Sequence, residues 1–356
     1  MAKRLAILVA CLVAAIALIA LVASIMLVRA QRNDAMEEFA WLPTECAPRG
    51  YPMEIVRGDL VFADGSSVYI PDKKVFHNGW GEIGSTHIVG AETRPVPVTL
   101  DLTWFSYTED KFYAGVFALP QEAILAEFKR GIEGPATGGK TTYDRIIVGM
   151  APGGHVSVWL EGQGVALEVA GFTASAADVS WTALLDNDEV SRPEYVRMVL
   201  KEALGVAGLA SLVPAPKGLW ERYRRRYPWR IEVVGAAPTT AWIKSFNGER
   251  EYVQSGKGRQ RRELRAVPRE IKLNWRQAAG RKRTATLELD EAQVFSAFET
   301  LAAADETSLA LRVVVKDSEP MVDVSLAKLD DEAASRGEPE ASIRLDRSTL
   351  QVHALD

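Results

Sequence analysis

The residues best suited to chemistry lie close together near residue 80. His77, Glu82 and His87 place two imidazoles and a carboxylate on one short segment, and zinc accepts both kinds of ligand. Their spacing matches none of the usual helical or zinc-knuckle arrangements, and the intervening residues are rich in glycine around Trp80. We therefore expect a glycine-rich loop organised by Trp80, with no metal and no cofactor. An enzyme with a site near His77, Glu82 and His87 remains the alternative.

A second motif, Gly134 to Thr141 (GPATGGKT), matches the phosphate-binding pattern G-x-x-x-x-G-K-[ST] letter for letter. Such a loop works when a strand leads into it and a helix leaves it, because the helix then points backbone N–H groups at the phosphate. Here the expected order is reversed, with a helix before the motif and a strand after it. The sequence also contains no G-x-S-x-G nucleophile motif. We therefore expect a helix-to-strand connection and predict that the protein is not an enzyme.

An uncharged, apolar run extends from Leu5 to Val28, with basic residues on both sides. As a helix it would measure roughly 36 Å, enough to cross a hydrocarbon core of about 30 Å. No clear cleavage site follows it, so we expect an uncleaved single-pass anchor in a bacterial inner membrane, with the body of the protein in the periplasm. Lipidation at Cys11 is an alternative, because Leu8 to Cys11 is similar to a lipobox.

The remaining chain contains segments that recur in the same order, which predicts an internal duplication. The matched pairs are Tyr51–Val56 with Tyr227–Val234, Val96–Trp104 with Val267–Trp275, Phe117–Phe128 with Leu287–Phe298, and Val156–Leu160 with Val322–Leu326. The expected boundaries are 1–32 for the anchor, 33–50 for a linker, 51–184 for the first unit, 185–226 for a helical connector and 227–356 for the second unit.

Hydrophobic periodicity within each unit predicts strands, then one helix, then more strands. Thr99–Trp104 and Glu270–Trp275 alternate as half-buried strands do. Asp290 suits the N-cap of the second helix, and Ser191-x-x-Glu194 has the form of a capping box at the start of the connector. The expected fold class is α+β: a transmembrane helix followed by two similar units, each an antiparallel sheet packed by one helix.

Charge is distributed unevenly along the chain. The net charge is −5, which does not favour nucleic-acid binding, but residues 205–283 contain 19 basic and 6 acidic residues. Arginines from Arg222 to Arg230 alternate with tryptophan and tyrosine, a combination that suits an anionic lipid surface or a protein partner. The other interpretation is that this segment packs against acidic parts of its own molecule, with arginine stems covering apolar surface.

Several short motifs together resemble a bacterial family of unknown function, domain of unknown function 2931. They are Tyr51-Pro52, Asn78 to Ser85 (NGWGEIGS), Thr103 to Tyr107 (TWFSY) and Ala151 to Gly154 (APGG), and the resemblance is clearest over residues 51–230. It implies an envelope protein and supplies no catalytic residues. Some families of this type are found beside secreted antibacterial effectors, which implies a role in immunity.

These observations together predict a membrane-anchored, periplasm-facing, non-catalytic binding protein, with immunity against a secreted effector as a specific version. A module that binds anionic lipid or an envelope polyanion is the alternative. Aromatic and charged residues of the glycine-rich loop and of the basic segment are the expected partner-binding residues. They are Trp80, Glu82, His87, Trp220, Arg224 and Trp229.

Overall fold

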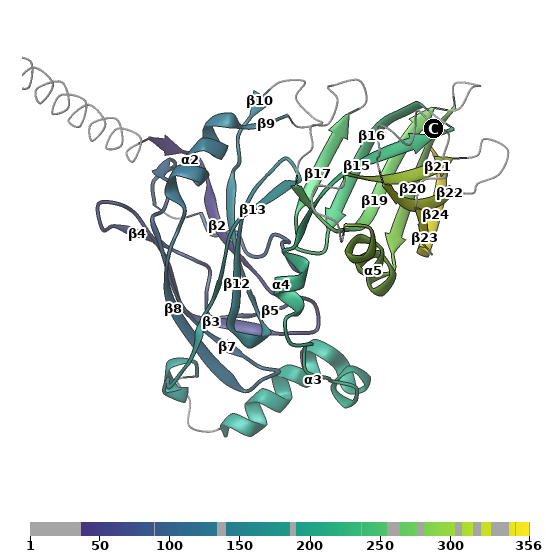
Figure 1. The fold of residues 1–356 in the computed structure, drawn as a ribbon. Helices are drawn as coiled ribbons and strands as arrows, with labels where there is room; N and C mark the ends of the chain where they lie inside the picture. Colours follow the sequence, from purple (N-terminus) through teal and green to yellow (C-terminus); the bar gives the residue numbers. More distant parts are fainter. Residues whose placement is uncertain are drawn as a thin grey trace, which may run out of the picture.

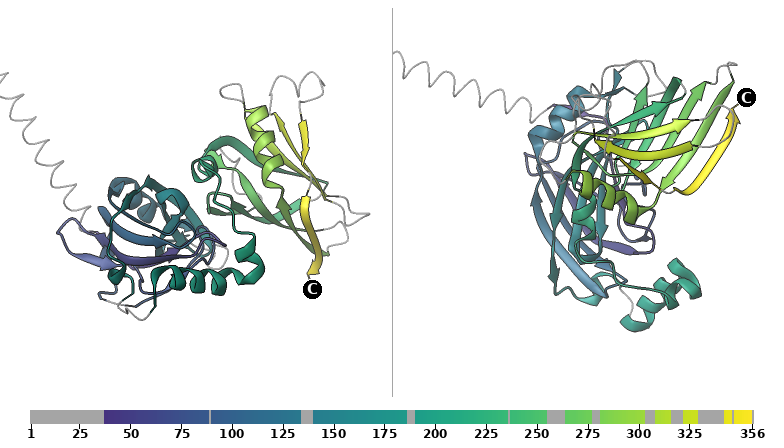
Figure 2. Two further views of the ribbon diagram at one scale, coloured as in Figure 1. Left: turned by 90° about the horizontal axis from the view of Figure 1, so that it is seen from below. Right: turned by 45° about the vertical axis from the view of Figure 1, so that its right-hand side comes forward.

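The computed structural model describes residues 37–88, 90–133, 140–185, 190–235, 237–254, 264–276, 281–302, 308–315, 322–328, 342–345 and 347–355. Among the described residues the fold is mostly β, with far more residues in strands than in helices. Its strands form two layered halves that lie side by side and are joined by short helical segments (Figures 1 and 2).

The first half contains two sheets. Its main strands are β2 (Leu42–Cys46), β3 (Met53–Val61), β4 (Ser67–Tyr69), β5 (Val75–Phe76), β7 (Thr99–Ser106), β8 (Lys111–Ala118), β11 (Arg145–Ala151), β12 (His155–Gly162), β13 (Val165–Thr173) and β14 (Ser175–Ala177). One sheet has the order β14-β8-β7-β3-β4, with β5 also on β3. In the other, β2 runs parallel to β11, which continues antiparallel into β12 and β13.

The second half is built from the later strands. They are β15 (Arg226–Val234), β16 (Ala237–Ser245), β17 (Arg250–Gln254), β18 (Leu264–Ala266), β19 (Pro268–Arg276), β20 (Lys282–Leu289), β21 (Leu309–Val315), β22 (Val322–Lys328), β23 (Ser342–Leu345) and β24 (Arg347–Leu355). A five-stranded sheet has the order β18-β15-β21-β22-β23. The strands β17-β16-β19-β20-β24 extend the β2-β11-β12-β13 sheet of the first half, so that one nine-stranded sheet runs through both halves.

Strand pairing in the second half repeats that of the first. The parallel pair β2 and β11 corresponds to β15 and β21, and the ladder β3-β7-β8-β14 corresponds to β16-β19-β20-β24. The expected match of Tyr51–Val56 with Tyr227–Val234 therefore pairs strands that do not correspond. Met53–Val56 lies in β3, whereas Tyr227–Val234 lies in β15, the counterpart of β2. Similar residue content is a weak guide to register when two adjacent strands are both rich in branched and aromatic side chains.

The α+β prediction is wrong, because each half has its core between two sheets. In the first half, Leu100 and Leu102 of β7 share one cluster with Ile146 and Val148 of β11. Helix α2 (Gln121–Arg130) adds Ile124, Leu125 and Phe128 to this core, and in Figure 1 it lies at the end of the sheets near the short strands β9 (Ile132–Glu133) and β10 (Lys140–Thr141). Helix α5 (Glu291–Leu301) contributes Val294, Phe295 and Phe298 to the second core. Hydrophobic periodicity correctly located the helices. It could not reveal that each sheet is covered by a second sheet instead of by a helix.

The two halves are connected through α3 (Arg192–Ala210) and α4 (Leu219–Tyr223). Helix α3 packs Val196, Val199 and Leu200 against Phe105 and other aromatic residues of the first half. Helix α4 lies between the halves (Figure 1) and buries Trp220. The connector therefore brings aromatic side chains of α4, Trp220 and Tyr223, to the junction of the two sheet systems.

The predicted single-pass inner-membrane protein with a periplasmic body is corrected by the structure. No helix within the described ranges is long and apolar enough to cross a bilayer. The predicted span Leu5–Val28 and Cys11 lie outside the described residues.

Candidate functional site

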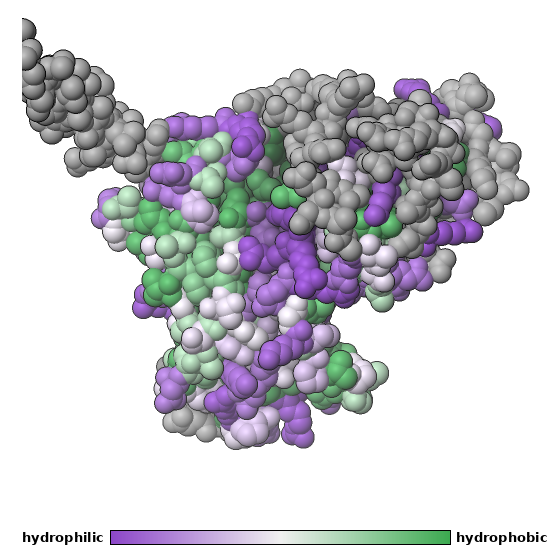
Figure 3. Space-filling view, in the orientation of Figure 1, coloured by the Kyte–Doolittle hydropathy of each residue, from purple (hydrophilic) through white to green (hydrophobic). Residues whose placement is uncertain are grey.

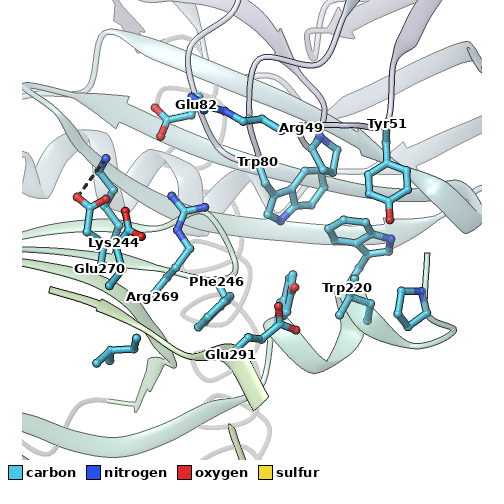
Figure 4. A pocket seen from close by; sticks show the side chains of 17 residues that line it. Arg49, Tyr51, Trp80, Glu82, Trp220, Lys244, Phe246, Arg269, Glu270 and Glu291 are labelled. Atoms are coloured by element: carbon cyan, nitrogen blue, oxygen red, sulfur yellow. Dashed lines mark ion pairs between the residues drawn. The ribbon is translucent and has the colours of Figure 1, made fainter. Parts of the chain in front are cut away.

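A cleft of about 760 Å³ lies where the two halves meet. The segment before β3 and the glycine-rich loop 78–85 form one wall, α4 forms a second, and β16, β19 and β20 of the second half form a third (Figure 4). Its lining combines aromatic and charged side chains. They include Arg49, Tyr51, Trp80, Glu82, Trp220, Tyr223, Lys244, Phe246, Arg269, Glu270, Glu288 and Glu291.

The aromatic side of the cleft is a packed cluster. The Trp80 ring is perpendicular to Trp159 at 4.8 Å between centroids and is tilted against Trp220 at 5.3 Å. Tyr51 meets the edge of Trp220 at 6.2 Å. Trp80 is 8% exposed and Trp220 is 5% exposed, so only a small part of each side chain faces the cleft. Such preformed aromatic packing holds the wall rigid.

The glycine-rich loop is fixed by the second half. Arg250 of β17 donates from Nη1 to the Gly81 carbonyl at 2.9 Å and to Glu82 Oε2 at 2.8 Å. The Gly81 N–H donates to Cys46 Sγ at 3.3 Å. Burial raises the pKa of the Cys46 thiol to about 12, so Cys46 is a neutral thiol buried beneath the loop. The loop therefore serves as a contact between the halves, which its sequence alone did not reveal.

Behind the aromatic wall is a buried polar network centred on Glu168 of β13. Its carboxylate accepts bonds from Arg224 Nε at 2.7 Å, Ser157 Oγ at 2.8 Å and Asn247 Nδ2 at 3.0 Å. Asn247 in turn offers its carbonyl to Trp159 Nε1 at 3.0 Å. Burial raises the pKa of Glu168, although the Arg224 guanidinium and the other donors favour the charged carboxylate. Residues of both halves are thus tied together through one carboxylate.

His155 begins β12 next to this network. Its Nε2 lies 3.2 Å from Ser157 Oγ, and its ring lies 5.9 Å from that of Trp80. Burial lowers the pKa of His155 to about 4, so the imidazole is neutral at pH 7. Ser157 is fully buried and hydrogen-bonded to Glu168, and so its hydroxyl has no open path to a substrate.

The structure brings together three of the six predicted partner-binding residues. Trp80, Glu82 and Trp220 line the cleft, whereas Arg224 lies behind it on Glu168. The other two lie elsewhere. His87 is exposed beside the Tyr69 hydroxyl at 3.2 Å, and Trp229 is buried in the second core, where it donates to the Ala266 carbonyl at 3.1 Å.

The alternative site at His77, Glu82 and His87 is not assembled. No group of three histidine, cysteine or acidic side chains in the described ranges is placed to hold a metal ion, and Glu82 is engaged by Arg250. Of the phosphate-loop motif, Gly134–Gly139 lie outside the described residues. The flanking strands β9 and β10 pair with each other antiparallel, so a strand, not a helix, leaves the motif.

Arginines of the basic segment are paired within the molecule. Arg222 and Arg225 both contact Glu299, Arg226 contacts Glu249, and Arg230 contacts Glu232. Hydrophilic residues correspondingly gather over α4, between the two halves (Figure 3). These pairs account for the arginines from 222 to 230 without an external polyanion, and they give the lipid-binding alternative no support.

Other cleft residues were missed by sequence reasoning. Arg49, Phe246 and Arg269 come from three segments with no recognisable motif, and only the fold places them around Trp80 (Figure 4). Tyr223 and Trp220 are one turn apart on α4, and their alternation with arginine was the single signal that pointed to this part of the cleft.

Comparison with known proteins identifies a family over part of the chain. No curated protein and no solved structure matches the sequence. The resemblance of the short motifs around the glycine-rich loop is confirmed as a family match, over a segment that ends within α3. Residues 29–204, just under half of the chain, match the family described as Protein of unknown function (DUF2931).

Proposed function

We propose that this chain is a non-catalytic binding protein that takes a segment of a partner protein into the cleft between its two halves. The observation that carries the proposal is the convergence of Tyr51, Trp80, Trp220 and Phe246 on one preformed cleft with charged side chains at its rim. Tryptophan, tyrosine and arginine are the residues most enriched at the energetic centres of protein interfaces.

The nature of the aromatic wall favours a protein segment over a flat sugar ring. Trp80 is tilted against Trp220 and perpendicular to Trp159, and Tyr51 is perpendicular to Trp220. Both tryptophans are buried, so neither offers a broad open ring face. A partner side chain inserted into the cleft would meet the small accessible parts of these tryptophans and the exposed parts of Tyr51 and Tyr223. At flexible surfaces, binding loses affinity because side chains must become ordered. The wall of this cleft is already packed, so binding would need little such ordering.

The connections between the halves support a rigid cleft. Arg250 joins the glycine-rich loop to β17, and Glu168 joins β13 to Arg224 and Asn247. A cleft held by buried ionic contacts from both halves keeps its shape, and shape complementarity then contributes to selectivity. Immunity against a secreted effector would be one instance of such binding.

Site-specific photocrosslinking in the native cells tests the proposal. A benzophenone amino acid at Tyr51, inside the cleft, should yield a discrete crosslinked partner. The same probe at Val116, which is 70% exposed on β8, is the matched control and should not yield that adduct. Adducts that are identical at both positions, or absent from both, would contradict the proposal.

A further inference from the structure

We infer that the partner segment is acidic: a carboxylate side chain next to an aromatic or aliphatic one, seated with its carboxylate on Arg49 and Arg269. This inference rests on the proposed function, since it specifies what the same cleft binds. The numbers of basic and acidic residues in the lining do not by themselves favour an anionic ligand. The inference rests on which of these charged residues already have a partner within the protein. Lys244, Arg49 and Arg269 stand against four glutamates in the lining.

The acidic lining residues already have partners. Glu82 is bound by Arg250 at 2.8 Å, and Glu270 is bound by Lys244 at 3.4 Å. The Tyr223 hydroxyl donates a hydrogen bond to Glu291. Burial is the main cause of the raised pKa of Tyr223, and Glu291 is the next. Glu288 also has an interaction within the protein. These carboxylates therefore already interact with other groups of the protein before any ligand arrives.

Arg49 and Arg269 differ from the other cations of the cleft. Both are exposed, and neither forms an ion pair or a hydrogen bond with any residue in the described ranges. Figure 4 shows the Arg269 guanidinium to the left of Trp80 and Arg49 above them, while Tyr51 and Trp220 lie on the right. Among the residues that the structure describes, the cleft thus presents guanidinium groups without an ion pair on one side and aromatic surface on the other.

This division specifies the ligand. A guanidinium group binds carboxylates with charge-assisted, often paired hydrogen bonds. The aromatic side needs an apolar group on the same ligand. An Asp or Glu flanked by an aromatic or aliphatic residue supplies both groups, and a basic segment would place its charges against Arg49 and Arg269.

Selection from a displayed library of random peptides on the full chain tests the inference. Enriched peptides should carry Asp or Glu beside an aromatic or aliphatic residue. Arg269→Glu and Arg49→Glu should each weaken the binding of such a peptide by roughly tenfold to a hundredfold, the usual value of a charge-assisted hydrogen bond. Arg197→Glu, an exposed arginine on α3, is the matched control and should bind as the unaltered protein does.

The outcomes separate the inference from the proposed function. Peptides that lack acidic residues but compete with the partner crosslinked at Tyr51 would overturn the acidic ligand and leave the cleft as the binding site. If no selected peptide depends on cleft residues for binding and no adduct forms at Tyr51, both the inference and the proposed function are overturned. Binding of an acidic polysaccharide with the same dependence on Arg49 and Arg269, and no peptide binding, would replace the protein ligand with a glycan.

Discussion

Gly81 and Gly248 lie against each other at the junction of the two halves. A Cβ atom on Gly81 would come within 2.5 Å of the Gly248 carbonyl oxygen, and both residues have positive φ, +73° and +87°. Gly81 belongs to the loop beside Trp80, and Gly248 lies in the turn between β16 and β17. The width of the cleft therefore depends on two residues without side chains.

Replacement of Gly81 by alanine is expected to destabilise the protein by about 2–5 kcal/mol, because it adds both backbone strain and a steric conflict with Gly248. Gly65→Ala is the matched control: its φ is +85°, but a Cβ there meets nothing within 4 Å. It should cost about 1–2 kcal/mol, the strain alone. Urea unfolding monitored by tryptophan fluorescence measures both values, and equal losses would show that the Gly81–Gly248 contact is not tight.

Removal of the Arg250 guanidinium should be far more costly than removal of a surface arginine. Arg250 also lies 3.9 Å from Glu161, whose side chain is 4% exposed. Arg250→Met leaves that buried carboxylate without its cation, a change expected to cost about 3–5 kcal/mol. Arg230→Met breaks an exposed pair with Glu232 and should cost no more than about 1 kcal/mol. The double variant Arg250→Met/Glu161→Gln should recover part of the loss, and no recovery would contradict the assignment of the cost to a stranded charge.

His155 should make the protein less stable as the pH falls from about 6.5 to about 4. The unfolded chain takes up a proton near pH 6.5, whereas the folded chain resists it until the lowered pKa of His155, about 4, is reached. The free energy of unfolding therefore falls by up to about 3 kcal/mol as the pH drops across this window. His155→Gln should have a flatter stability profile between these pH values. Glu161 and Glu168, whose pKa values are raised by burial, have the opposite dependence but are common to both proteins, so the difference between the two profiles isolates His155.

Cys46 should be inert towards thiol reagents in the folded protein. It is fully buried, and its raised pKa of about 12 leaves roughly a thousandfold less thiolate at pH 8 than an ordinary cysteine has. In a Cys11→Ala background, Ellman's reagent should report no fast thiol until denaturant is added. Rapid labelling of the folded chain would contradict the packing of Cys46 beneath Gly81.

The sequence predicted local elements well and their assembly poorly. Alternation correctly located β7 and β19, because one face of each strand is buried and the other is not. Strand β2 escaped notice because its burial is almost continuous and its short LPTEC sequence contains a proline and no alternation. With β2 and β16 unrecognised, the second sheet of each half was missed, and a helix was assigned the role of covering layer.

The cleft could not have been derived from the sequence. Arg250 and Gly81 are separated by 169 positions, and nothing in either local sequence indicates the other. The sequence singled out Trp80 in its glycine-rich loop and Trp220 beside the arginine-rich segment, but whether these rings face a partner or each other depends on long-range packing. His87 and Trp229 come from the same two parts of the sequence, yet one is at the surface near Tyr69 and the other is in a core.

Helix capping offers a direct comparison between a sequence signal that is used and one that is not. Asp290 accepts a hydrogen bond from the Gln293 N–H at the start of α5, whereas Ser191 makes no such side-chain bond at the start of α3, despite the Ser-x-x-Glu pattern. Asp290→Ala should therefore cost about 1 kcal/mol, the usual value of an N-cap, and Ser191→Ala should lie within about 0.5 kcal/mol of the unaltered protein. Both are read from the same urea unfolding curves. A larger loss of stability at Ser191 than at Asp290 would show that the capping box of α3 forms in solution. The start of α3 would then be more stable than its contacts in the structure indicate.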